Sequence, residues 1–178
     1  MKRKVMEMDI EIYTGYYANL RKYLAGGCVP IGISVGTPEY LKGNPIITFM
    51  RRLAPTYALL RVEDEGEYTR RYRVEVLGGL DYRSVVDEIR AKAAQAGKKK
   101  AILLCYEKPP KFCHRSLVAE WLNSKGEFYV REYGYEGVQC VPASQRPKEP
   151  EQPDLFEAAG VRIPGYLGPG EGRGVSNG

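Results

Sequence analysis

The chain has 178 residues, which is enough for one domain with a substantial hydrophobic core. It contains no run of about 18 apolar residues, which excludes a membrane-spanning helix. Its basic start lacks the apolar segment of a secretory signal, so we expect a cytoplasmic protein. A net charge of +5 and fourteen tyrosines favour a polyanionic or base-bearing partner, although a basic surface and tyrosines at the edge of a core explain the same counts.

Two strands and a short helix are expected near the start of the chain. Residues 9–14 alternate apolar and polar side chains as a strand does, and residues 16–24 predict a short helix. Residues 29–35 are typical of a buried strand, and a loop rich in Gly, Pro and Asn follows them. Residues 57–62 form a third apolar run, which leads into an acidic turn over residues 63–67.

The middle of the chain predicts two helices. Residues 68–77 fit a strand or a helix, and we favour the helix because the next strand needs a crossover connection. Asp81 or Ser84 is placed to cap a second helix, which Gly97 ends. The apolar face of this second helix consists of Val85, Val86, Ile89 and Ala93.

Residues 101–105 are a continuous apolar run, as in a central strand buried on both faces. A helix over residues 114–125 and a last strand over residues 127–133 follow. Strands and helices therefore alternate, and we expect a single three-layer α/β domain with a mainly parallel sheet over residues 1–143. Pro, Gly, Glu and Gln dominate residues 144–178, which we expect to form a disordered tail.

The four cysteines are expected to be free thiols. None of them belongs to a Cys-x-x-Cys pair, and without a secretory signal a disulfide framework is not expected. The cysteines are Cys28, Cys105, Cys113 and Cys140.

Reactive side chains gather where the strand over residues 101–105 ends and the next helix begins. Ligands of open α/β sheets bind at the carboxyl ends of strands, and a helix N-terminus favours an anion or a thiolate. The candidate catalytic residues are Cys105, Glu107, Cys113 and His114, where the cysteines are possible nucleophiles and His114 and Glu107 possible proton-transfer groups. Arg115 and Ser116 are the candidate anion-binding residues.

Three interpretations of this segment stay open. In the first, it is a catalytic or anion-binding loop. In the second it is structural, with Cys113 in the core, His114 as a cap and Arg115 paired with Glu107. In the third, Cys105, Cys113 and His114 bind a metal, although their spacing matches no familiar zinc motif and we expect no cofactor.

The same residues resemble the family called domain of unknown function (DUF) 488. Its hallmark is Leu-Leu-Cys-x-Glu at a strand end followed by Cys-His-Arg, found here as Leu103-Leu104-Cys105-Tyr106-Glu107 and Cys113-His114-Arg115. Tyr13-Thr14-Gly15 and Tyr72 fit the family more loosely, and the resemblance spans roughly residues 10–133. The family usually has Asp-Val-Arg where this chain has Ser34-Val35-Gly36, so the acid and the arginine are missing.

A short motif in the tail resembles the peptide by which bacterial replication and repair proteins bind the sliding clamp. It is Gln152-Pro153-Asp154-Leu155-Phe156, in which Gln152 would donate a hydrogen bond and Leu155 and Phe156 would enter an apolar groove. A chance match of five residues, or packing of this segment onto the domain, explains the motif as well.

The leading hypothesis is an enzyme that acts on a nucleic acid or another phosphate-bearing ligand through the Cys-His-Arg segment. The alternative is a non-catalytic accessory module of DNA replication or repair that the tail recruits to a sliding clamp. The sequence names neither the substrate nor the reaction.

Overall fold

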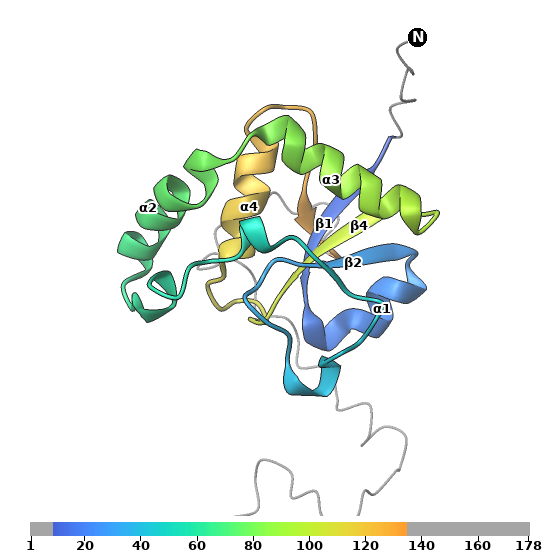
Figure 1. Cartoon of the computed structure of the whole chain (residues 1–178), viewed down its shortest axis with the longest axis horizontal. Helices are drawn as coiled ribbons and strands as arrows, with labels where there is room; N and C mark the ends of the chain where they lie inside the picture. Colours follow the sequence, from blue (N-terminus) through green and yellow to red (C-terminus); the bar gives the residue numbers. More distant parts are fainter. Residues whose placement is uncertain (1–8, 135–178) are drawn as a thin grey trace, which may run out of the picture. The chain divides into compact units, whose positions relative to one another are not determined.

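The computed structural model describes residues 9–134, in which five strands form one parallel sheet (Figure 1). The order of the strands is β3-β2-β4-β1-β5. Their bounds are Glu11–Tyr16 for β1, Cys28–Gly32 for β2, Thr48–Phe49 for β3, Lys100–Cys105 for β4 and Arg131–Glu132 for β5. The expected tail and the domain boundary at residue 143 lie outside the described residues.

Helices cover both faces of the sheet, which confirms the three-layer α/β prediction. The helices are α1 (Leu20–Ala25), α2 (Glu65–Glu75), α3 (Tyr82–Gln95) and α4 (His114–Asn123). Figure 1 shows α2, α3 and α4 on one side of the strands and α1 on the other. The larger core lies under α2, α3 and α4, and the smaller core lies under α1.

Strand β4 is the central strand, as its apolar run predicts. It pairs with β1 on one side and with β2 on the other. Ala101 and Leu103 point into the larger core, whereas Ile102 and Leu104 point into the smaller one. Because the side chains of a strand alternate between faces, a strand buried on both faces must be apolar throughout.

Strand β1 continues through Gly15 to Tyr16, so the prediction that the strand stops at residue 14 is wrong. The reason is a close approach, because a Cβ atom at Gly15 would lie 2.7 Å from the Tyr23 ring of α1. The expected helix over residues 16–24 is a 3-10 helix over Tyr17–Asn19 followed by α1.

Three other segments differ from the predictions. The loop after β2 contains the two-residue strand β3, which the sequence analysis missed. The third apolar run is a 3-10 helix over Leu59–Arg61. The last strand keeps only Arg131–Glu132 of the expected residues 127–133. The conformation of each segment depends on packing and pairing with distant parts of the chain. The periodicity of the local sequence carries no information about these contacts.

The helix assignments in the middle of the chain are confirmed, and their caps are visible. The Asp64 side chain accepts a hydrogen bond from the Glu67 N–H at 2.6 Å, so the expected acidic turn is the first turn of α2. The Asp81 side chain accepts one from the Ser84 N–H at 2.8 Å and caps α3. Within residues 9–134, no helix has the length and apolar character needed to cross a membrane.

Candidate functional site

The candidate site lies where β4 ends and α4 begins. Cys105 is the last residue of β4, Cys113 is the N-cap residue of α4, and His114 is the first residue of that helix. The connecting loop brings the end of the strand and the start of the helix together, as the sequence analysis expects. All three side chains are more than nine-tenths buried.

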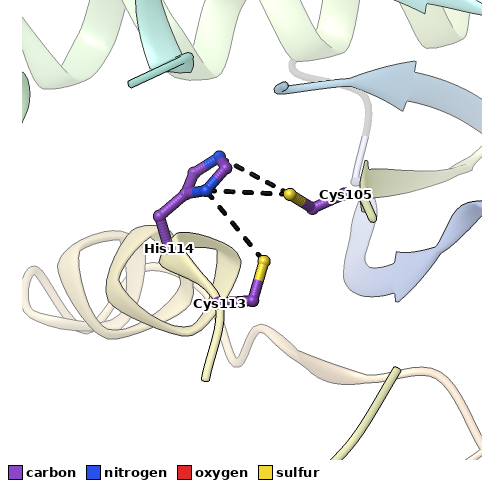
Figure 2. Close-up of side chains that lie close together, drawn as sticks. All are labelled: Cys105, Cys113 and His114. Carbon is purple, nitrogen blue, oxygen red and sulfur yellow. Dashed lines mark hydrogen bonds between the residues drawn. The ribbon is translucent and has the colours of Figure 1, made fainter. Parts of the chain in front are cut away.

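The three side chains point toward one another (Figure 2). His114 Nδ1 lies 3.7 Å from Cys105 Sγ and 4.0 Å from Cys113 Sγ. One ligand atom from each residue lies within 4.8 Å of the other two, so the set is also placed to hold a metal ion. The structure thus brings together three of the four residues predicted to be catalytic.

The orientation of His114 is fixed from outside the cluster. Its Nε2 atom donates a hydrogen bond to the Ile33 carbonyl at 2.8 Å, because a carbonyl oxygen can only accept. The Tyr72 ring packs against the imidazole, with the two ring centroids 5.3 Å apart. The Tyr72 hydroxyl donates a hydrogen bond to the Leu53 carbonyl at 2.5 Å. Nδ1 is thus the ring nitrogen that faces the two sulfur atoms.

The two thiols have opposite pKa shifts. Burial opposes ionisation of Cys113, but the hydrogen bond from Cys105 and the neighbouring His114 outweigh it and lower the pKa of Cys113 well below its ordinary value. The hydrogen bond to Cys113, aided by burial, raises the pKa of Cys105 well above its ordinary value. Cys113 is therefore the more readily ionised thiol of the pair.

The cluster opens into a pocket of about 610 Å³. One wall is aliphatic and comes from the segment before α2, which includes Leu59 and Val62. Aromatic side chains of Tyr68, Tyr106 and Phe112 form another part of the lining, with the Tyr68 and Phe112 rings 5.5 Å apart. Glu63, Glu65 and Glu107 also line the pocket.

Glu107, a predicted proton-transfer residue, lines this pocket, but its carboxylate pairs with a lysine and not with His114. Its carboxylate forms an ion pair with Lys111 at 3.6 Å, and its side chain is 45% exposed. Its backbone carbonyl accepts a hydrogen bond from Arg115. Only the backbone of Glu107 thus corresponds to the pairing with Arg115 that the structural interpretation expects.

Arg115 and Ser116, the predicted anion-binding residues, are buried and contact other residues of the protein. The Arg115 side chain is fully buried, and its Nε atom lies 3.1 Å from a carboxylate oxygen of Glu132 in β5. The same oxygen accepts a hydrogen bond from Thr14 in β1 at 2.7 Å. The Ser116 hydroxyl donates to the Cys113 carbonyl at 2.8 Å, and neither residue lines the pocket.

The sequence analysis did not foresee Glu132, Ile33 or Tyr68 as parts of the site and its support. Glu132 contacts Arg115, and Ile33 contacts His114. Both contacts join residues from different elements, so no local sequence pattern predicts them. Tyr68 gave one weak signal, because it lies one helical turn before Tyr72 on the same face of α2.

The segment that departs from the family pattern also borders the pocket. Ser34 is buried, and its hydroxyl donates to the Gly36 carbonyl at 2.6 Å. The Tyr17 hydroxyl lies 2.7 Å from the same Ser34 oxygen. Ser34 and Gly36 line the pocket beside Cys105, so the missing acid and arginine would stand at its wall.

Gln152, Leu155 and Phe156, the predicted clamp-binding residues, lie outside the described residues, as does Cys140.

Comparison with known proteins identifies the family. The model of DUF488-N3a, described as the active DUF488-N3 subclade, matches residues 21–126 and thus more than half of the chain. No curated protein and no solved structure shows significant similarity to the chain. The match includes both halves of the Cys105 to Arg115 motif, and the chain belongs to the DUF488 family.

Proposed function

We propose that the chain is an enzyme in which the Cys113 thiolate attacks a nucleic acid or another phosphate-bearing ligand. The observation that carries this proposal is the convergence of Cys105, Cys113 and His114 on one open pocket. The pocket lies at the carboxyl end of β4, where ligands of open α/β sheets bind. The description of the matched subclade as active is in keeping with catalysis.

Cys113 is the nucleophile of choice because of its place in the fold. It is the N-cap residue of α4, and the dipole of a helix favours negative charge at its N-terminus, although no backbone N–H of α4 donates to the sulfur. In the proposed step, Cys113 Sγ forms a bond to an electrophilic atom of the substrate. The bond to the leaving group breaks, and the leaving group takes that electron pair together with the proton of the Cys105 thiol.

A water molecule completes the cycle. It attacks the atom bound to Cys113 Sγ, and the sulfur leaves as a thiolate with the bonding electron pair. His114 Nδ1, 3.7 Å from Cys105 Sγ, accepts the proton of that water and returns it to Cys105. The three side chains thereby regain their original protonation states.

The lining of the pocket indicates which part of the ligand enters it. Three glutamates line the pocket, so its charge disfavours a phosphate, whereas carboxylates can accept hydrogen bonds from amino groups. They are Glu63, Glu65 and Glu107. Aromatic and aliphatic walls suit a flat ring. The base or sugar is therefore expected inside the pocket. The phosphate would lie outside it, where the net charge of +5 favours a polyanion.

Protection from alkylation tests the ligand class. Iodoacetamide modification of Cys113 is followed by peptide mass spectrometry with and without a nucleoside monophosphate or a short single-stranded oligonucleotide. We expect one of these ligands to slow modification of Cys113 at least about tenfold while Cys28, buried in the smaller core, reacts unchanged. Equal rates with and without both ligands would refute the nucleic-acid assignment.

The tail motif supports a second candidate function, that of an accessory module recruited to a bacterial sliding clamp. Leu155 and Phe156 are adjacent apolar residues in a segment rich in Pro and Gly, which suits a peptide that inserts into a groove. A pull-down with purified clamp tests the idea. The double variant Leu155→Ala/Phe156→Ala should lose binding, and binding that persists in this variant would exclude the motif.

A further inference from the structure

The atoms that face one another at the site are soft metal ligands at ligand spacing. Cys105 Sγ and Cys113 Sγ lie 3.7 Å and 4.0 Å from His114 Nδ1 (Figure 2). In a tetrahedral zinc site with Zn–S near 2.3 Å and Zn–N near 2.0 Å, sulfur and nitrogen ligands stand about 3.5 Å apart. Shifts of a few tenths of an ångström would therefore bring the three atoms to coordination distance.

The surroundings of His114 are those of a metal-binding histidine. Metal-bound histidines usually donate their second ring N–H to a carbonyl or carboxylate, which fixes the tautomer and the ring orientation. Here Nε2 donates to the Ile33 carbonyl at 2.8 Å, which leaves the lone pair of Nδ1 directed at the sulfur atoms. Tyr72 holds the other side of the ring through its contact at 5.3 Å.

The burial of the three ligand residues and their position at the pocket also favour metal binding. All three ligand residues are more than nine-tenths buried, so water competes poorly for their ligand atoms. The same three residues line the pocket, so a fourth coordination position faces it. Three protein ligands and one open position are the pattern of zinc sites that bind water or a substrate.

We propose that Cys105, Cys113 and His114 form a Zn²⁺ site with two thiolates, His114 Nδ1 and a fourth position open to the pocket. Binding replaces each remaining S–H bond by a Zn–S bond and releases the proton to solvent. The bound ion occupies the sulfur of Cys113 and switches off its reactivity. This inhibitory consequence rests on the proposed function, whereas the binding of the ion does not.

Metal titration of the full-length protein tests the site. Protein freed of metal by a chelator is titrated with Co²⁺, whose visible and thiolate charge-transfer bands report tetrahedral sulfur coordination, and then with Zn²⁺ against a chromophoric chelator. We expect one ion per chain. Cys105→Ser, Cys113→Ser and His114→Gln should each weaken Zn²⁺ binding at least about 100-fold. The control Cys28→Ser should bind as the original protein does, because Cys28 lies in the smaller core.

A second variant keeps the test decisive if a ligand variant fails to fold. Cd²⁺ added to the Cys28→Ser/Cys140→Ser protein, which retains only Cys105 and Cys113, should give the charge-transfer absorbance of two thiolates per ion. Absence of stoichiometric binding, or binding that survives in all three ligand variants, would overturn the metal site.

The alkylation rate of Cys113 separates this inference from the proposed function. We expect fast modification of Cys113 in metal-free protein and at least tenfold slower modification when Zn²⁺ is bound. Fast modification without any metal binding would overturn the metal site and leave the nucleophile in place. Metal binding through the three assigned residues, with Cys113 no more reactive than Cys28 in metal-free protein, would support the site and refute the proposed function.

Discussion

At the scale of single residues, the third member of the Cys-His-Arg segment has a different environment from the first two. Cys113 and His114 face the pocket, whereas Arg115 is buried against Glu132 and reaches the Glu107 carbonyl. Arg115 thus ties α4 to β5 and to the loop after β4. Burial raises the pKa of Cys113, and the charge of Arg115 helps to lower it, after the larger contributions of Cys105 and His114.

Loss of Arg115 is expected to destabilise the protein. Arg115→Met removes the charge but keeps most of the volume, and it leaves the Glu132 carboxylate buried without its cation. Breaking one partner of a buried ion pair costs about 3 to 5 kcal/mol. Urea denaturation followed by circular dichroism measures this loss.

The double variant Arg115→Met/Glu132→Leu provides the control for that prediction. Removing both charges should restore much of the free energy of unfolding, because the buried carboxylate is removed together with the arginine that contacts it. A single Arg115→Met variant as stable as the original protein would show that Glu132 does not depend on this cation.

At the scale of elements, the sequence predicts best where one segment carries its own signal. The apolar run of β4, the capped helix α3 and the start of α4 all have local patterns, and the structure confirms the positions of these three elements. Strand β3 has two residues, and it exists because Thr48 and Phe49 pair with β2. The role of Glu132 could not be predicted from local sequence either, since its partner Arg115 lies 17 residues away.

The cap of α3 makes this local signal testable. Asp81→Ala removes the side chain that accepts the hydrogen bond from the Ser84 N–H, which should cost about 1 kcal/mol of unfolding free energy. Asp87→Ala, which removes an exposed carboxylate within the same helix, should change it by less than about 0.5 kcal/mol. Equal effects of the two substitutions in urea denaturation would mean that Asp81 acts by its charge and not as a cap.

At the scale of the whole molecule, tyrosine is a main component of the core under α1. Tyr13, Tyr17 and Tyr23 lie in that core with their side chains almost fully buried. Burial raises the pKa of Tyr17 to about 12 and that of Tyr23 further, from an ordinary value of 10.0. From composition alone, the abundance of tyrosine favours a partner that stacks its bases. Part of this abundance is explained by the tyrosines that fill the smaller core.

These buried hydroxyls make the stability of the fold sensitive to alkaline pH. Between about pH 10 and 12 the unfolded chain loses the tyrosine protons that the folded protein keeps, so the free energy of unfolding falls as the pH rises. Urea denaturation at a series of pH values measures the slope. Tyr17→Phe should reduce the slope, and an unchanged slope would show that Tyr17 does not hold its proton in the fold.

The proposed function depends most on the reactivity of Cys113 in its open pocket. Metal-free protein is treated with limiting iodoacetamide near neutral pH, and peptide mass spectrometry gives the modification rate of each cysteine. We predict that Cys113 reacts first and at least about tenfold faster than Cys28, because Cys113 lines the pocket and caps α4, whereas Cys28 lies in a closed core. Cys113 reacting no faster than Cys28 would contradict the assignment of a nucleophile to this site.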